Sequence, residues 1–200
     1  DALPISGGVL SALLIHLLES GQVDFVVHVQ AAADDPLRND AVISTSRDEI
    51  ARGAGSRYAP AAPVACLPQA LARPGRFAFV GKPCDVAAVR KMIGRDPALA
   101  PRIPFLLSFM CAGTPSLQGT HEVLQRLNMP REQVVRFRYR GDGWPGLTRA
   151  EAAGGQVATM DYNTSWGTIL NRYLQPRCKL CADGTGEFAD VVAADAWYGK

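Results

Sequence analysis

The stretch that decides the fold is RFAFVGKPCDVAAVRKMIGRDPALAPRIPFLLSFMC, residues 76–111. Residues 76–81 and 103–111 are short, mostly apolar runs, and residues 83–94 between them have the composition and length of a helix. A strand, a helix and a second strand in this order are typical of neighbouring parallel strands joined by a crossover. Since both apolar runs are nearly continuous, the sequence predicts a sheet that helices cover on both faces.

The residues before this unit predict more of the same sheet. Residues 6–21 place leucines along one helical face, with Ser6 as N-cap and Gly21 beyond the end, and residues 23–30 and 40–45 predict two strands. A short helix is expected from Ser46, with Ser46 and Glu49 forming a capping box. We interpret the Pro/Ala-rich residues 59–75 as a linker or a loop over the core.

The residues after the unit predict a helix at 115–128, a hairpin-like stretch at 134–162, a helix at 164–174 and a last strand within 188–197. The expected fold is therefore α/β, with a mixed, partly parallel sheet flanked by helices. We expect the chain to consist of two modules, residues 1–72 and residues 73–200. The chain begins at Asp1 without a methionine, so we expect it to be a fragment of a longer protein.

The overall composition excludes several classes of protein. The 200 residues are 48% hydrophobic, enough for a sizeable core, and the formal net charge of +2 is too small to attract nucleic acid. The longest apolar stretch, residues 9–18, is interrupted and ends at Glu19, so no membrane span is expected. Five cysteines are an odd number, which favours a reducing compartment and reactive or ligating thiols, and we expect the cytoplasm.

A C-x-x-C pair, Cys178 and Cys181, raises three possibilities: a redox disulfide, a zinc site or an iron-sulfur cluster. A redox pair would stand at a helix N-terminus early in a thioredoxin-like unit, whereas this pair follows a helix and a proline late in the chain. Zinc would require two further ligands at close spacing, and the nearest histidine, His121, is distant and lies within an expected helix.

A cluster requires four thiolates, and Cys84 and Cys111 complete that number. Each follows the end of a predicted strand, at the sheet edge where open α/β folds bind ligands. Taken singly, either residue could equally be an ordinary small core residue. The fifth, Cys66, stands alone among apolar residues and is interpreted as core.

Six blocks of the sequence resemble, in order, the beta-subunit family of coenzyme F420 hydrogenase/dehydrogenase. They are SGGVLSALLIHLLESGQVDFVV, TSRDEIARGAGSRY, FVGKPCDVAAVRKM, SFMCAGTPS, YRGDGWPG and PRCKLCADGTGEFADVVAADAW. The resemblance covers nearly the whole chain. It implies an oxidoreductase that binds FAD and a 4Fe-4S cluster and passes electrons between them, with Cys84, Cys111, Cys178 and Cys181 as the cluster ligands.

The resemblance also gives roles to polar, glycine-containing segments. The helix start at Ser6, Gly7 and Gly8 offers free N–H groups and a positive dipole end to the FAD pyrophosphate, although a simple capped helix would look the same. A second set of residues could hold the phosphate, the ribityl chain or the ring edges of the flavin: Thr45, Ser46, Arg47, Gly55, Ser56 and Tyr58. A glycine-rich loop adds Arg140 and Trp144, which could lie beside a flavin or simply pack in the core.

Members of the family act in F420 reduction, in formate dehydrogenases and on chlorophyll intermediates, so the implied substrate is a two-electron carrier such as F420 or a pigment. An anionic substrate could contact Lys82, Arg90 or Lys91, and ferredoxin or another electron-transfer subunit is the expected partner. Many relatives carry a ferredoxin-like segment before the SGG block, and it is absent from this sequence, either because the fragment begins after it or because this member never had it. The alternative is a non-enzymatic module in which zinc or a cluster only staples the chain together.

Overall fold

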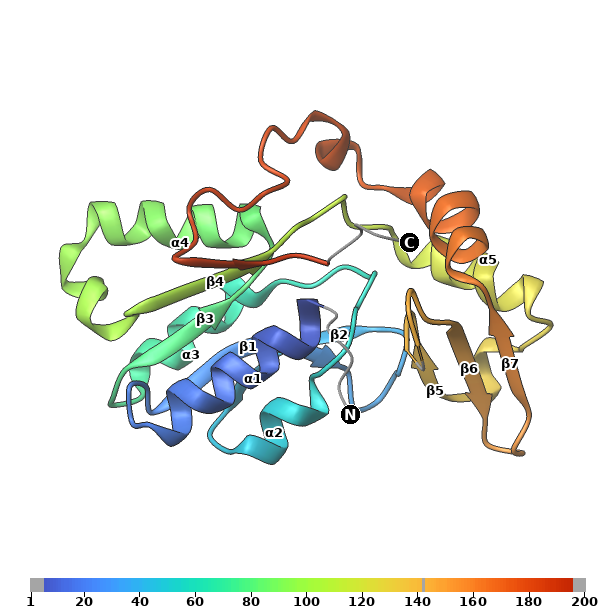
Figure 1. Ribbon diagram of the computed structural model, residues 1–200, viewed down its shortest axis with the longest axis horizontal. Coiled ribbons are helices and arrows are strands. Elements are labelled where there is room, and N and C mark those ends of the chain that lie inside the picture. The colour runs from blue at the N-terminus through green and yellow to red at the C-terminus, as the bar shows by residue number, and fades with distance from the viewer. Residues whose placement is uncertain (1–5, 142, 196–200) are drawn as a thin grey trace.

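The computed structural model describes residues 6–141 and 143–195 (Figure 1). Its larger sheet has five strands in the order β2-β1-β3-β4-β8. Strand β2 is antiparallel to β1, and the other neighbours are parallel, as predicted for a mixed sheet. The strands are β1 (Phe25–Ala31), β2 (Asn39–Ser44), β3 (Phe77–Val80), β4 (Phe105–Phe109) and β8 (Val191–Ala193).

Helices cover both faces of this sheet, because alternate residues of each strand point to opposite sides. On one face Phe77 and Phe79 pack with Val86 of the next helix; on the other Ala78 packs with Leu14. The first face is covered by η1 (Pro63–Cys66), α3 (Leu67–Ala72) and α4 (Pro83–Arg95), and the second by α1 (Ser6–Glu19) and α2 (Arg47–Arg52). After α4, η2 (Pro97–Arg102) leads into β4.

A smaller antiparallel sheet with its own core lies beside the first, at the right of Figure 1. Tyr139, Leu124 and Leu170 are almost completely buried in that core. Its elements are α5 (Leu117–Arg126), η3 (Arg131–Gln133), β5 (Val134–Arg138), β6 (Thr148–Ala152), β7 (Val157–Met160), the π-helical η4 (Asn163–Ile169) and η5 (Leu170–Tyr173). The predicted hairpin-like stretch is thus a three-stranded sheet.

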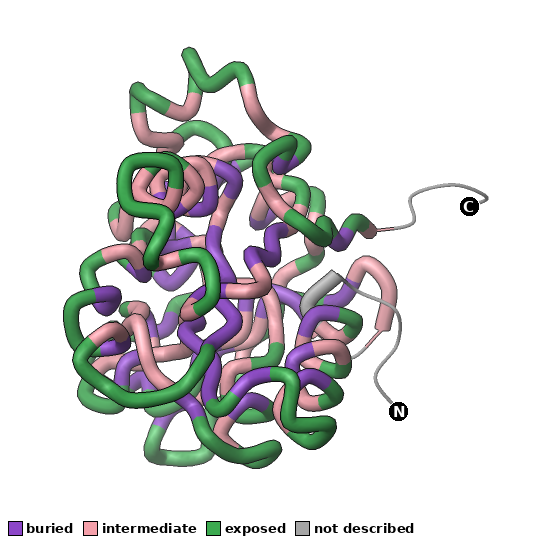
Figure 2. The backbone as a smooth tube through the Cα atoms, turned by 90° about the vertical axis from the view of Figure 1, so that its left-hand side faces the viewer, coloured by how far each residue is buried: buried purple, intermediate pink, exposed green. Residues whose placement is uncertain are grey.

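The chain crosses between the two sheets twice, and both crossings matter for the site. Residues 110–116 lead from β4 to α5, and residues 174–190, which include η6 (Pro176–Leu180), return from η5 to β8. Figure 1 shows the returning segment arching over the molecule, and in Figure 2 much of this outer arch is exposed while the strands beneath it are buried. Both cysteines of the C-x-x-C pair lie on this segment.

Two expectations need correction. Residues 59–75 are not an extended linker, because Pro63 and Pro68 each stand at the start of a helical turn and the helices η1 and α3 bury Leu67 under the sheet. The capping box also differs from the prediction. Ser46 does accept a bond from the Glu49 N–H, but the main backbone bond to the Glu49 carboxylate comes from the N–H of Thr45, at 2.6 Å, and the N–H of Ser46 contributes less.

This cap predicts a pH-dependent contribution to stability. The backbone N–H of Thr45 lowers the pKa of Glu49, so the ionised carboxylate stabilises the fold above its usual pKa, and the effect disappears as the pH falls through the lowered value. Replacing Glu49 with Gln should therefore cost about 0.5–1 kcal/mol at pH 7. Urea unfolding at pH 7 and at pH 3 measures the difference, and an equal cost at both pH values would contradict this explanation.

Among the helices of the described residues, none combines the length and the apolar character that crossing a membrane requires. The expected core residue Cys66, the last residue of η1, is buried against the sheet.

Candidate functional site

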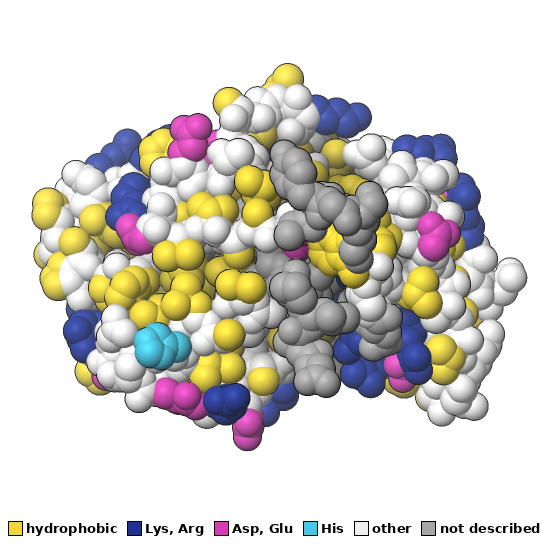
Figure 3. All heavy atoms as spheres, viewed as in Figure 1, with side chains coloured by type: hydrophobic (Ala, Val, Ile, Leu, Met, Phe, Trp, Pro, Cys, Tyr) yellow, Lys and Arg dark blue, Asp and Glu magenta, His cyan; other side chains and the backbone are white. Residues whose placement is uncertain are grey.

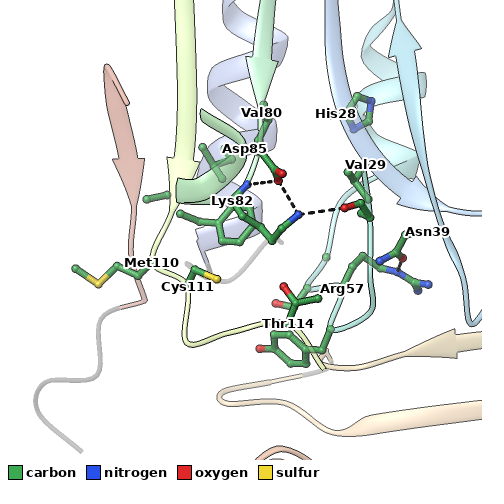
Figure 4. A pocket seen from close by; sticks show the side chains of 18 of the residues that line it. His28, Val29, Asn39, Arg57, Val80, Lys82, Asp85, Met110, Cys111 and Thr114 are labelled. Atoms are coloured by element: carbon green, nitrogen blue, oxygen red, sulfur yellow. Dashed lines mark hydrogen bonds and ion pairs between the residues drawn. The ribbon is translucent and has the colours of Figure 1, made fainter. Parts of the chain in front are cut away.

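A cavity of about 550 Å³ opens at the carboxyl ends of the parallel strands, where α/β sheets bind ligands (Figure 4). Val29 of β1, Val80 and Gly81 after β3, Met110 after β4 and Ala193 of β8 all line it. The volume lies within the range of cofactor and small-molecule sites, and most of the lining is apolar. We call it the large cavity.

Helix α1 closes the large cavity on one side, and aromatic residues that lie near the smaller sheet close it on another. Leu10 and Leu14 of α1 form one wall. Tyr58, Tyr162 and Trp166 contribute aromatic rings to another, and the rings of Tyr58 and Trp166 lie 4.7 Å apart. Flat aromatic walls of this kind suit a planar ring system.

Arg57 lines the large cavity but is held by the protein itself. Its guanidinium donates to the side chain of Asn39 at 2.8 Å and to the carbonyl oxygens of Pro36, Arg38 and Phe137 at 2.8, 3.0 and 3.2 Å. Burial lowers the pKa of this arginine. Since Phe137 belongs to β5 and Asn39 to β2, Arg57 ties the two sheets together at the cavity's edge.

Arg140 and Asp195 form a buried ion pair at the cavity wall, with Nη1 and Oδ2 2.5 Å apart. The side chains are 3% and 10% exposed, and the guanidinium also lies 5.1 Å from the ring of Trp144 and 4.9 Å from that of Tyr162. Burial alone would lower the pKa of Arg140, but the hydrogen bond to Asp195 raises it. The pair joins the loop after β5 to the end of β8.

Lys82 and Asp85 form a second ion pair where β3 passes into α4. Lys82 Nζ lies 2.6 Å from Asp85 Oδ2 and donates to the carbonyl of Ala61 at 3.3 Å. The Lys82 N–H donates to the same carboxylate at 3.1 Å. Gly81 allows Asp85 this position, because a Cβ on Gly81 would lie 2.7 Å from the Asp85 Cβ. Figure 4 shows the ammonium of Lys82 directed into the large cavity.

A second cavity, of about 360 Å³, is lined by all four predicted cluster ligands: Cys84, Cys111, Cys178 and Cys181. Cys84 stands in the first turn of α4, Cys111 follows β4, and the C-x-x-C pair lies on the returning segment. We call this the cysteine cavity. It gathers thiols from three segments that are far apart in the sequence.

Hydrogen bonds between the two crossing segments bring these cysteines together. The Cys111 N–H donates to the carbonyl of Gly184 at 2.8 Å, and the Gln175 N–H donates to that of Thr114 at 3.0 Å. Pro115 and Leu174 form an isolated β-bridge between the same segments. The crossing that leads to α5 and the crossing that returns to β8 therefore hold one another in register.

The chemistry around the thiols fits iron-sulfur ligation. Backbone N–H groups point at sulfur, as they do around clusters: that of Thr114 lies 3.4 Å from Cys178 Sγ, and that of Gly113 bonds to Cys111. Burial, more than any other cause, raises the pKa values of Cys84 and Cys111. A metal bound by these thiols would have to displace their protons.

The described residues contain no group of three or more His, Cys, Asp or Glu side chains that could hold a metal ion. A zinc ion needs its ligands to converge on one point. A four-iron cluster is wider than a single ion, and its ligands surround a larger volume. All four cysteines line one cavity, and their role as cluster ligands stays a prediction from the sequence.

The two cavities share a wall. Residues 111–114, Lys82 and Gly184 line both of them, so that the backbone of one loop separates the aromatic-walled space from the sulfur-lined space. In Figure 4 the side chains of Cys111 and Lys82 lie close together at this boundary. A ligand in the large cavity and a metal group in the cysteine cavity would be immediate neighbours.

Gly113 makes this wall possible and gives a test of it. Its φ of +112° is rarely adopted by other residues, and a Cβ there would lie 2.9 Å from Leu174 Cδ2 and 3.3 Å from Cys178 Cβ. Gly113→Ala should therefore lower the stability by about 1–3 kcal/mol and displace Cys178. Thermal unfolding together with metal content measures both effects, with Gly167→Ala, which has open space, as the control. Equal behaviour of the two variants would contradict the assigned packing.

Some of the predicted flavin contacts meet at the large cavity and others do not. Gly55, Ser56, Tyr58 and Arg140 line it. Gly8, Thr45, Ser46, Arg47 and Trp144 are not among the lining residues; Trp144 lies against Arg140, and Arg47 is exposed and pairs with Glu19 at 3.2 Å. Ser6 and Gly7 begin α1, and their side chains lie outside the described part of the chain.

Of the residues suggested for an anionic substrate, Lys82 lies at the cavity, Arg90 is bound to Asp190 at 2.7 Å, and Lys91 is exposed on α4. Sequence reasoning missed the aromatic wall of Tyr162 and Trp166. Trp166 stands on an element that the sequence predicts only as an ordinary helix, and Tyr162 ends the predicted hairpin-like stretch just before it. Nothing local reveals which side chains of this region meet the other sheet.

Comparison with known proteins places the chain among redox proteins. Family models for the coenzyme F420 hydrogenase/dehydrogenase beta subunit match its N-terminal part at residues 5–67 and its C-terminal part at residues 75–200. The F420 hydrogenase beta subunit of Methanosarcina barkeri is 24% identical over 92% of this chain and 62% of its own length. A subunit of the F420H2 dehydrogenase of Methanosarcina mazei is 26% identical over 96% of this chain and 53% of its own length.

A chain from the structure of the F420-reducing [NiFe] hydrogenase complex of Methanosarcina barkeri shares the fold, with a TM-score of 0.70 and 22% identity over 92% of this chain and 62% of that one. The chain thus spans less than two thirds of these relatives. The two family models together cover most of its residues and confirm the resemblance seen in the sequence. The chain belongs to the family of coenzyme F420 hydrogenase/dehydrogenase beta subunits.

Proposed function

We propose that this protein is an iron-sulfur flavoprotein oxidoreductase that passes electrons between a 4Fe-4S cluster and FAD. The observation that carries the proposal is the wall shared by the large cavity and the cysteine cavity. An electron donor and an electron acceptor bound in these two spaces would be separated by little more than the loop of residues 111–114. Membership of a family of redox subunits supports the same function.

The large cavity has the properties that FAD requires. Its apolar strand ends and the rings of Tyr58, Tyr162 and Trp166 would hold the flat ring system. Backbone and side-chain groups of the loop that contains Gly55 and Ser56 would contact the polar parts of the cofactor, as predicted from the sequence. Bound FAD supplies two-electron chemistry, whereas a bound cluster supplies single electrons.

The cysteine cavity would hold the cluster on Cys84, Cys111, Cys178 and Cys181. The protein's own contribution there is to keep the thiols partly buried and to direct N–H groups at sulfur, which tunes the reduction potential of such groups. Cys181 is exposed, while the other three are half-buried. The cysteine cavity therefore reaches the surface near Cys181, where an electron-transfer partner such as ferredoxin or a further subunit would approach.

The relatives named for F420 suggest the substrate class: a two-electron deazaflavin carrier, with a pigment as the other possibility. The residues of the large cavity would exclude water from the reacting rings, and hydride transfer requires no side-chain base. The residues that line the cavity are accordingly given binding and positioning roles, not acid–base catalysis.

A turnover assay tests this function directly. Protein purified without oxygen is reconstituted with FAD, iron and sulfide, and mixed with reduced viologen and oxidised F420. Bleaching of F420 absorption that depends on both added FAD and iron is the expected result. If F420 is not reduced but a chlorophyll-type pigment is, the substrate class is corrected. A protein that takes up zinc or a cluster but neither binds FAD nor turns over any acceptor would be the structural module instead.

A further inference from the structure

Lys82 occupies a position that the proposed function does not explain. Of the described residues that line both cavities, it is the charged one; the others are Cys111, Ala112, Gly113, Thr114 and Gly184. Its side chain is only 18% exposed, so solvent screens its charge incompletely. A fixed positive charge thus stands between the two spaces proposed for the redox groups.

The ammonium is held in place by groups on both sides. Asp85 contacts it at 2.6 Å and is itself fixed by the Lys82 N–H, while the Ala61 carbonyl accepts a second bond from the ammonium. Its position is therefore set by α4 and by the loop before η1, not by free rotation of a long side chain.

The other cations at the two cavities either are bound by other protein groups or line only one cavity. Arg57 donates to four protein oxygens, and Arg140 is paired with Asp195. Arg177 lines only the cysteine cavity and is exposed. A charge that both redox groups would experience at short range is therefore supplied by Lys82, and its strength is set by how far Asp85 neutralises it.

We infer that the positive charge of Lys82 raises the reduction potentials of both the flavin and the cluster, and that the negative charge of Asp85 limits this effect. The inference rests on the proposed function. Each electron that enters either group adds negative charge, which a neighbouring ammonium stabilises and a neighbouring carboxylate destabilises. A charge near both groups therefore shifts the two potentials in the same direction.

Two substitutions predict shifts of opposite sign. Lys82→Met removes the positive charge and should lower both midpoint potentials. Asp85→Asn removes the counter-charge, can still accept the Lys82 N–H, and should raise both. We expect at least about a tenfold change in the equilibrium constant for two-electron reduction of the flavin, which is ~30 mV. Lys82→Arg keeps the charge and should leave both midpoint potentials close to those of the unmodified protein.

The experiment is a dye-equilibrated redox titration of the reconstituted protein, followed by flavin absorbance and by the EPR signal of the reduced cluster. Lys91→Met, an exposed lysine of the same helix, controls for a general change of net charge. The inference is supported if Lys82→Met and Asp85→Asn shift the potentials in opposite directions while Lys91→Met does not. Shifts of the same sign, no shift, or an equal shift in the control would overturn it.

A binding measurement separates this inference from the proposed function. If the unmodified protein holds neither FAD nor a cluster, the proposed function fails. If Lys82→Met is the only variant that lacks bound flavin, its apoprotein is titrated with oxidised FAD and with reduced FAD. The ratio of the two affinities reports the change in the flavin's reduction potential, because binding and reduction are linked. The inference requires reduced FAD to lose more affinity than oxidised FAD. Equal losses, or no detectable binding of either form, would contradict it.

Discussion

Replacing any one of Cys84, Cys111, Cys178 or Cys181 with serine is expected to abolish the broad absorption at ~400 nm that a bound 4Fe-4S cluster gives. All four line one cavity, and a hydroxyl is a poor substitute for a thiolate ligand. Cys111 also belongs to the wall shared with the large cavity. Anaerobic absorbance spectra and iron content of the four variants measure the loss.

The matched control is Cys66→Ser. Cys66 is buried beneath the sheet beside Leu67 and does not line the cysteine cavity, so this variant should keep its iron and lose only stability. A thiol-disulfide oxidoreductase would behave differently, since it would depend on the C-x-x-C pair and retain its activity without Cys84 and Cys111. Full iron content in Cys84→Ser or Cys111→Ser would therefore contradict the ligand set.

Asp195→Asn is expected to destabilise the protein by about 3–5 kcal/mol, since it removes the carboxylate that pairs with the buried guanidinium of Arg140. The loss should also weaken FAD binding, because both residues line the large cavity and the pair connects the end of β8 to the loop that follows β5. Urea unfolding gives the free energy of unfolding, and flavin fluorescence gives the affinity.

The exposed pair Arg47 and Glu19 provides the control, since its side chains are 65% and 54% exposed. Glu19→Gln should cost less than about 1 kcal/mol and leave FAD binding unchanged. If Asp195→Asn costs no more than Glu19→Gln, the buried pair does not hold the two parts of the molecule together at the cavity.

The fold could be predicted because its strands and helices carry local signals. The run at 77–80 alternates large and small residues that pack on opposite faces, and α1 has a continuous leucine stripe. Residues 59–75 misled the prediction because proline is read as a breaker. In the first turn of a helix it is tolerated instead, as Pro63 and Pro68 show.

The sequence pointed to the residues of the cysteine cavity more completely than to those of the large cavity. The rule that ligands bind beyond strand ends led to Cys84 and Cys111, and the structure places both beside the C-x-x-C pair. The walls of the large cavity depend on contacts between distant segments, such as Tyr58 with Trp166, which no local pattern encodes. Thr45 and Arg47 looked equally suitable, yet the cap of α2 and an ion pair to Glu19 engage them elsewhere.

The space-filling view shows apolar side chains gathered on the face where β8 and α1 lie (Figure 3). Val9 of α1, Val191 and Val192 of β8, and Met110 after β4 are exposed. Apolar side chains gathered in this way are typical of a surface that contacts further protein, whether another subunit or another part of a longer chain.

The most direct test of the central claim is the cofactor content of protein purified and reconstituted without oxygen. Acid extraction followed by chromatography identifies the flavin, metal analysis separates iron from zinc, and EPR after dithionite reduction identifies the cluster type. The account predicts FAD and iron in the ratio that one FAD and one 4Fe-4S cluster require, with the EPR signal of a reduced cluster. A colourless protein that contains zinc and no flavin would contradict it.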